Sequence, residues 1–128
     1  MRLLLDTHTL LWFPADDPHL SPAAKPALED PANERWLSPI SLLEIALKVR
    51  LGKLPLPAPF AVMFPADLVA ADMHLLPLET EHIEPLTVLP WHHQDPFDRL
   101  IAATALVEGL PLVSADAAFD AYGVARLW

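Results

Sequence analysis

The chain has 128 residues, 53% of them hydrophobic, so it is long and apolar enough to form a packed domain rather than a disordered segment. It contains no cysteine, which excludes a disulfide framework, a thiolate zinc site and a cysteine nucleophile and agrees with a reducing cytoplasm. Its formal net charge of -9 has the wrong sign for binding nucleic acid through a broad basic surface.

The first half of the chain predicts alternating strands and helices. Residues 2–5 are an apolar run and predict a buried strand, and residues 9–13 predict a short helix. A Ser-Pro pair opens a further helix over residues 21–30, because proline suits the first helical position. Residues 34–38 predict the second strand.

The middle of the chain predicts two helices and a strand. Ser41 and Glu44 have the spacing of a capping box, and the apolar residues between and after them predict a helix that stops at Gly52. Residues 60–71 predict another helix, and residues 74–78 the third strand.

The strongest helical pattern lies near the C-terminus. Asp95 suits the N-cap, Pro96 the first helical position, and Gly109 the stop. The remaining predicted elements are a short helix capped by Thr80, a strand at residues 110–114, a short helix at 117–122 and an edge strand at 124–127.

This alternation predicts an α/β fold of three layers, with a central parallel sheet of about five strands and helices on both faces. No repeat or linker interrupts the pattern, so residues 1–128 are expected to form a single domain. The apolar run before Asp6 is too short for a signal peptide, and residues 54–66 are shorter than the roughly 20 residues that a spanning helix needs. We therefore expect a cytoplasmic protein without a membrane span.

Four acids occupy similar structural points. Asp6 and Asp116 stand at or just after the ends of predicted strands, whereas Glu44 and Asp98 stand in the first turn of predicted helices. Strand ends and helix starts at one edge of a parallel sheet share a crevice, so these carboxylates are expected to meet there.

Carboxylate oxygens suit Mg²⁺ or Mn²⁺. Such an ion lowers the pKa of bound water and polarises a phosphodiester oxygen, which indicates phosphodiester hydrolysis. A nuclease can be acidic overall, because a bound metal ion partly cancels the charge of the carboxylates and makes the contact with phosphate. Without metal, a crowded cluster is expected to raise at least one carboxyl pKa.

Structural roles are open for each acid considered alone. Glu44 can complete the capping box or pair with Lys48, and Asp98 can simply stabilise a helix start. Asp116 can act as a turn residue. Asp6 is harder to explain in this way, because an unpaired charge buried after an apolar run is costly.

Other residue types point to no alternative chemistry. His92 and His93 are adjacent, which is not the spacing of a closed zinc site, so we interpret them as solvated loop or interface residues. The three glycines form neither a P-loop nor a dinucleotide fingerprint, and there is no nucleophilic serine elbow. We interpret the four tryptophans as core or interface residues in preference to platforms on which bases stack.

Four segments, in this order, resemble the PIN-domain family, particularly the toxins of VapBC-type toxin–antitoxin pairs: LLLDTHTLLW, SPISLLEIALK, DPFDRLIAATAL and LVSAD. The likeness covers nearly the whole chain. Each motif is weak by itself, whereas the ordered set is specific. The resemblance implies a sheet of order 3-2-1-4-5, Mg²⁺- or Mn²⁺-dependent endoribonuclease activity on RNA, homodimerisation and inhibition by a cognate antitoxin protein.

The resemblance also implies roles by position. The catalytic and metal-binding acids that it implies are Asp6, Glu44, Asp98 and Asp116, with Thr7 and Ser114 as supporting hydroxyls. Arg99, next to the third acid, is expected either to orient phosphate or to pair with Asp95 or another carboxylate.

Two other functions remain open on the sequence. One is a catalytically inactive PIN-like module that works through protein contacts, with structural acids. The other is a metal-dependent phosphatase, which would use the same acids on small phosphate esters without a groove for a strand.

Overall fold

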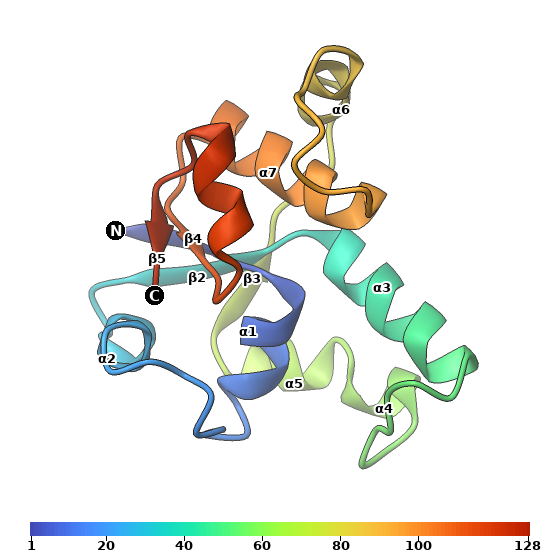
Figure 1. Ribbon diagram of the computed structural model, residues 1–128. Coiled ribbons are helices and arrows are strands. Elements are labelled where there is room, and N and C mark those ends of the chain that lie inside the picture. The colour runs from blue at the N-terminus through green and yellow to red at the C-terminus, as the bar shows by residue number, and fades with distance from the viewer.

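The computed structural model describes residues 1–128 and has a five-stranded parallel sheet of order β3-β2-β1-β4-β5 at its centre (Figure 1). The strands are β1 (Arg2–Leu5), β2 (Glu34–Leu37), β3 (Met73–Leu75), β4 (Leu112–Val113) and β5 (Arg126–Leu127). β1 is the central strand, because Leu4 pairs with Trp36 of β2 on one side and with Leu112 of β4 on the other. The predicted α/β fold and strand order are confirmed.

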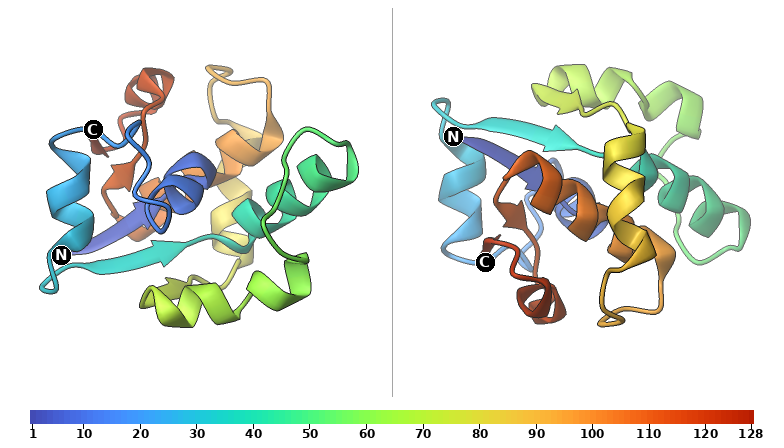
Figure 2. Two further views of the ribbon diagram at one scale, coloured as in Figure 1. Left: turned by 90° about the horizontal axis from the view of Figure 1, so that it is seen from below. Right: turned by 90° about the horizontal axis from the view of Figure 1, so that it is seen from above.

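Helices cover both faces of the sheet. The core on one face includes residues of α1 (Thr7–Trp12), α2 (Ala24–Glu29), α3 (Pro39–Arg50) and α5 (Ala66–Ala70). The core on the other face includes residues of α7 (Pro96–Glu108) and the 3-10 helix η2 (Ala117–Tyr122). Seen from below, α1 lies in front of the sheet, and seen from above α7 does (Figure 2).

The three leucines of β1 are fully buried between these layers. Successive side chains of a strand point to opposite faces, so Leu3 and Leu5 join the core that contains α1 and α2, whereas Leu4 joins the core that contains α7. The central strand is therefore held from both sides, and the residue that follows it is held in a fixed position.

The remaining helices are α4 (Phe60–Met63), α6 (Thr80–Ile83) and the 3-10 helix η1 (Glu84–Thr87). Thr80 is the first residue of α6 rather than its N-cap, because Glu79 occupies the N-cap position. The backbone N–H of Glu79 donates a hydrogen bond to Nδ1 of His82 at 3.0 Å. None of the helices combines the length and the apolar character that a membrane crossing requires.

Helix α3 begins earlier than predicted. Ser38 is its N-cap, and the serine hydroxyl oxygen accepts a hydrogen bond from the backbone N–H of Ile40 at 3.2 Å, with Pro39 at the first helical position. The predicted capping box of Ser41 and Glu44 is therefore wrong. Glu44 lies in the second turn of the helix, not in the first.

The single helix predicted for residues 60–71 is also wrong, because α4 and α5 are separate helices. Pro65 separates them: it has no backbone N–H, and in a helix interior its ring would clash with the carbonyl group four residues earlier. At the C-terminus, β4 and β5 pair through only two residues each, so both strands are shorter than predicted.

The burial of β1 gives a stability prediction. We expect Leu4→Ala to lower the free energy of unfolding by about 2–5 kcal/mol, because the substitution leaves a cavity between the sheet and α7. Urea unfolding of the purified protein measures the change. Leu43→Ala, at a position that is 46% exposed, is the matched control, and an equal loss in the two variants would contradict the assignment of β1 as the buried centre.

Candidate active site

Asp6 directly follows β1 and is the N-cap of α1. One carboxylate oxygen, Oδ1, accepts a hydrogen bond from the backbone N–H of Thr9 at 2.9 Å, and Oδ2 accepts one from the Ser114 hydroxyl at 2.5 Å. Asp6 is only 7% exposed. Its carboxylate is thus fixed at the C-terminal end of the central strand, the position at which open α/β sheets bind ligands.

Glu44 reaches the same edge of the sheet from α3. The Thr7 hydroxyl donates a hydrogen bond to its Oε1 at 3.2 Å, and the Lys48 ammonium lies 2.7 Å from its Oε2. The predicted pairing with Lys48 is therefore confirmed. Thr7 is the residue next to Asp6, so its hydrogen bond connects Glu44 to the end of β1. Glu44 is therefore buried beside β1 as well as being paired along its own helix.

Asp98 is the third residue of α7, as predicted. Its pKa is raised to about 6; burial is the largest cause, the negative charge of Asp95 is the next, and those of Glu44 and Asp116 act in the same direction. No group of the chain donates a hydrogen bond to the Asp98 carboxyl group. The expected raised pKa is confirmed, although burial contributes more to it than repulsion does.

Asp116 follows β4 and is the N-cap of η2. The backbone N–H of Ala118 donates to its Oδ1 at 2.9 Å, and Nε2 of His93 lies 2.7 Å from its Oδ2. Burial raises the pKa of Asp116, but the hydrogen bonds from His93 and Ala118 outweigh burial, so the pKa is lowered. Asp116 is therefore ionised in the folded protein at neutral pH, in contrast to the partly protonated state of Asp98 near pH 6.

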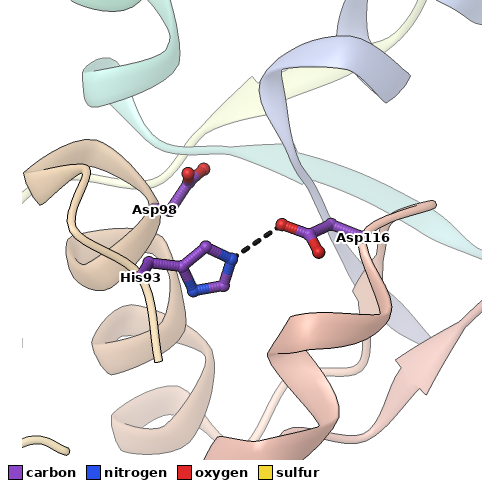
Figure 3. Close-up of side chains that lie close together, drawn as sticks. All are labelled: His93, Asp98 and Asp116. Atoms are coloured by element: carbon purple, nitrogen blue, oxygen red, sulfur yellow. Dashed lines mark hydrogen bonds and ion pairs between the residues drawn. The ribbon is translucent and has the colours of Figure 1, made fainter. Parts of the chain in front are cut away.

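Two groups of possible ligand atoms meet at this edge. Carboxylate oxygens of Glu44, Asp95 and Asp98 lie within 4.8 Å of one another, and the same limit holds for atoms of His93, Asp98 and Asp116. Figure 3 shows the second group, in which Asp98 from α7, Asp116 from beyond β4 and His93 from the segment before α7 converge on one point. Asp98 belongs to both groups, so it lies at the centre of the cluster.

Asp6 belongs to neither group but is connected to the second one. The Ser114 hydroxyl donates to Asp6 and accepts a hydrogen bond from the backbone N–H of Asp116 at 3.1 Å. The structure thus brings Glu44, Asp98 and Asp116 together and places Asp6 next to them through one shared serine.

Three neighbouring residues differ in how well their positions were predicted. Asp95 caps α7 as expected, because its Oδ1 accepts a hydrogen bond from the backbone N–H of Phe97 at 2.8 Å. Arg99 contacts no carboxylate: its guanidinium group donates to the carbonyl oxygens of Leu89 and Pro90. The interpretation of His93 as a solvated loop residue is wrong, because its side chain is only 9% exposed and binds Asp116.

Residues 3–125 match the family model of the PIN domain. This chain belongs to the PIN-domain family. PIN-domain proteins are mostly metal-dependent nucleases, and the family generally uses a divalent metal ion. The resemblance inferred from the four sequence segments is confirmed.

Known PIN-domain relatives and structures extend this result. Ribonuclease VapC22 of Mycobacterium tuberculosis (strain ATCC 25618 / H37Rv) is 32% identical over 115 residues, which are 89% of this chain and 86% of the relative. The structure of VapBC2 from Rickettsia felis bound to a DNA fragment from the promoter has a TM-score of 0.71 at 18% identity, with 98% of this chain and 97% of that chain covered. VapBC-1 from nontypeable Haemophilus influenzae has a TM-score of 0.65 at 16% identity, covering 98% and 96%. At 16–18% identity, the similarity to these two solved structures shows only that the folds are alike.

The cluster of acids around Asp98 suits a divalent cation. The atoms that could bind the ion are mainly carboxylate oxygens, the hard ligands that Mg²⁺ and Mn²⁺ prefer. Asp98 lies near three other acids and has no hydrogen-bond donor of its own, so a cation at this position would relieve the conditions that raise its pKa. The residues present therefore fit the metal that the family generally uses.

The pKa of Asp98 gives a prediction for stability without metal. The folded pKa of about 6 lies above the usual 3.8, so the folded protein binds the extra proton between these values and its stability falls as pH rises through this window. Asp98→Asn removes the effect. In the presence of a chelator we expect the variant to be more stable than the wild type at pH 7 by roughly 1–2 kcal/mol, a value discounted for partial exposure, and to match it near pH 4.

Urea unfolding between pH 4 and pH 7 measures this difference. Glu81→Gln, at an exposed position on α6, is the control and is expected to leave the pH dependence unchanged. A stability difference between Asp98→Asn and the wild type that stays constant with pH would contradict the raised pKa of Asp98.

Proposed function

We propose that this protein is a metal-dependent endoribonuclease that hydrolyses RNA phosphodiester bonds and is the toxin of a VapBC-type toxin–antitoxin pair. Membership of the PIN-domain family and the 32% identity to ribonuclease VapC22 support this proposal. The main support is geometric: acids from separate segments, Glu44, Asp98 and Asp116, meet at the edge of the sheet.

We assign metal binding and catalysis to Asp6, Glu44, Asp98 and Asp116. A bound Mg²⁺ or Mn²⁺ ion supplies a water molecule of lowered pKa and a Lewis acid for the phosphodiester oxygen. Hydrogen bonds from the Thr9 backbone and Ser114 keep Asp6 in one orientation. Asp98 has no such partner, so it is the carboxylate best able to orient the attacking water or to accept its proton.

The proposal accounts for an acidic protein that acts on RNA. With a net charge of -9 the chain has few cations for phosphate contact. The affinity for the scissile phosphate would therefore depend on the bound ion rather than on a basic surface. For the same reason we expect a chelator to weaken RNA binding as well as to stop cleavage.

We further propose that the protein is cytoplasmic, forms a homodimer and is inhibited by a cognate antitoxin protein. The structural likeness to VapBC proteins supports an antitoxin partner. The surface also has large apolar residues that suit protein contacts, because Val69, Val88 and Trp91 are 76%, 84% and 77% exposed. The absence of cysteine agrees with a reducing compartment.

One observation favours a second candidate, an inactive PIN-like module that works through protein contacts. Lys48 pairs with Glu44 and His93 with Asp116, so two of the acids have partners without any metal ion. A metal-dependent phosphatase is the third candidate, because the same acids would suit small phosphate esters.

The proposed chemistry predicts the effect of removing single carboxylates. We expect Asp6→Asn and Asp98→Asn each to reduce Mn²⁺- or Mg²⁺-dependent cleavage of RNA oligonucleotides to the level seen with a chelator, while circular dichroism shows an unchanged fold. The cause is the loss of an anionic ligand from the cluster. Gel analysis of labelled RNA measures the cleavage.

Asp67→Asn is the matched control, since Asp67 is an exposed acid on α5 and is expected to leave the rate unchanged. Full cleavage by both site variants would contradict the assigned chemistry. Hydrolysis of phosphate monoesters with no cleavage of oligonucleotides would favour the phosphatase, and no metal-dependent hydrolysis of either would favour the interaction module.

A further inference from the structure

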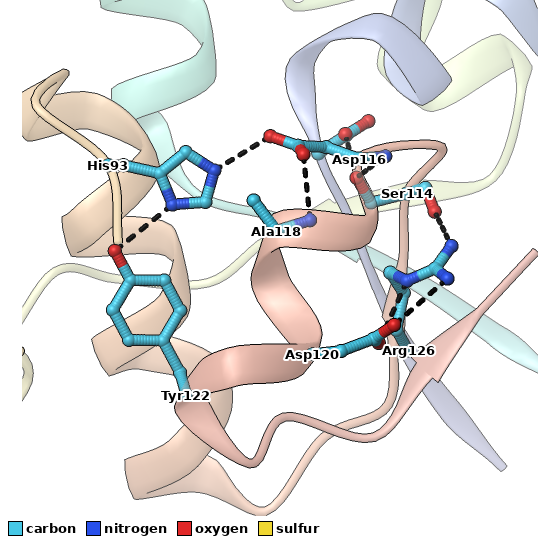
Figure 4. Close-up of polar contacts among 8 residues, drawn as sticks. His93, Ser114, Asp116, Ala118, Asp120, Tyr122 and Arg126 are labelled. Carbon is cyan, nitrogen blue, oxygen red and sulfur yellow. Dashed lines mark hydrogen bonds and ion pairs between the residues drawn. The ribbon is translucent and has the colours of Figure 1, made fainter. Parts of the chain in front are cut away.

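Three side chains beside the site are joined by hydrogen bonds: two come from the two ends of η2, and the one between them comes from the segment before α7 (Figure 4). His93 lies between Tyr122 and Asp116, with Nδ1 at 3.0 Å from the Tyr122 hydroxyl and Nε2 at 2.7 Å from the Asp116 carboxylate. His93 comes from the segment before α7, whereas Asp116 and Tyr122 are at opposite ends of η2. The histidine therefore joins two segments that both contribute acids to the site.

The direction of these hydrogen bonds follows from the partners. An ionised carboxylate has no proton to donate, so Nε2 of His93 must donate to Asp116. The Tyr122 hydroxyl can then donate to a neutral Nδ1 or accept from a protonated one. In both states of the ring, Nε2 carries a proton that points at Asp116, so this nitrogen has no free lone pair with which to bind a metal ion.

Aromatic packing holds the His93 ring in this position. The ring lies nearly parallel to that of Tyr122, at 9° and 5.5 Å between centroids, and 4.6 Å from the ring of the buried Phe119. The side chain of Asp116, by contrast, is 44% exposed. Hydrogen bonds from Ala118 to one of its oxygens and from His93 to the other hold this exposed carboxylate.

We propose that His93, supported by Tyr122, is a positioning residue that orients the Asp116 carboxylate toward Asp98 and so completes the metal site. This proposal rests on the proposed metal-dependent function. The nearest side-chain nitrogen of His93 and carboxylate oxygens of Asp98 and Asp116 lie within 4.8 Å of one another, so a rotation of Asp116 away from His93 would open the cluster. His93 acts through Asp116 and is not itself a ligand of the ion.

Two substitutions separate the hydrogen bond from the packing. His93→Phe keeps an aromatic ring against Tyr122 and Phe119 but removes the donor to Asp116, whereas His93→Gln retains an N–H group at a similar reach. We expect His93→Phe to weaken Mn²⁺ binding, measured by calorimetry, by about 10–100-fold, the range typical for loss of a residue that orients a ligand. His93→Gln is expected to restore most of the affinity.

The same proteins give two further measurements. Saturating Mn²⁺ is expected to restore most of the RNA cleavage rate of His93→Phe, because the variant loses affinity for the ion rather than a group that reacts. Electron spin-echo spectroscopy of bound Mn²⁺ is expected to detect no directly coordinated ¹⁴N in the wild type. His92→Ala is the matched control, a neighbouring exposed histidine that packs edge-on against Tyr122 and is expected to leave Mn²⁺ affinity unchanged.

Each possible result decides the proposal. Equal Mn²⁺ affinities for the wild type and a folded His93→Phe would overturn it, and so would a coordinated ¹⁴N signal that His93→Gln abolishes, since His93 would then be a ligand. If His93→Phe does not fold, Tyr122→Phe replaces it: a several-fold loss of Mn²⁺ affinity supports the proposal and no loss overturns it.

The same measurements separate this proposal from the proposed function. If the Mn²⁺ affinities of the wild type and the variants follow the expected order but the wild type cleaves no RNA, the ribonuclease assignment is overturned and the role of His93 stands. A wild type that binds no Mn²⁺ would overturn both.

Discussion

The gathering of several carboxylates at one edge of the sheet is the constraint on which the chemistry of the site depends. The ends of β1 and β4 are adjacent in the parallel sheet, and α3 and α7 project their acids toward the same edge. Burying like charges together is unfavourable unless each has a partner. Most of these acids have one, from Ser114, Lys48 or His93, but the Asp98 carboxyl does not. Burial and then the negative charge of Asp95 raise its pKa to about 6. A divalent cation next to this carboxyl would offset both effects.

The parts of this arrangement that depend on local patterns were predictable from the sequence. The apolar run before Asp6 indicated a buried strand, and Pro96 after a capping aspartate indicated the start of α7, so the acids next to these signals could be placed at strand ends and helix starts. The strand order came from the resemblance to PIN-domain proteins and not from the hydrophobic pattern. The start of α3 was predicted at Ser41 from the capping-box spacing, but the helix begins after Ser38, where Pro39 suits the first helical position. Glu44 consequently lies one turn further into the helix.

Contacts between distant segments were not predictable. His93 differs from its neighbour His92 only in what faces it across the fold, and its partner Asp116 is 23 residues away. The weak signal available was its position two residues before the cap of α7, which brings it to the edge of the sheet where the acids meet. Arg99 was likewise expected at a carboxylate or phosphate, but the carbonyl oxygens of the preceding loop are closer and take all of its observed hydrogen bonds. Neither outcome depends on hydrophobic periodicity or residue spacing.

The most direct test of the central claim is the number of protons released when Mn²⁺ binds, measured by titration calorimetry at one pH in buffers of different ionisation enthalpy. Because the pKa of Asp98 is about 6, the metal-free protein is partly protonated there, and binding at pH 6 is expected to release roughly half a proton per ion, falling toward zero at pH 8. Binding at pH 6 without proton release, or no binding at either pH, would contradict the account of the acids as one charge-crowded cation site.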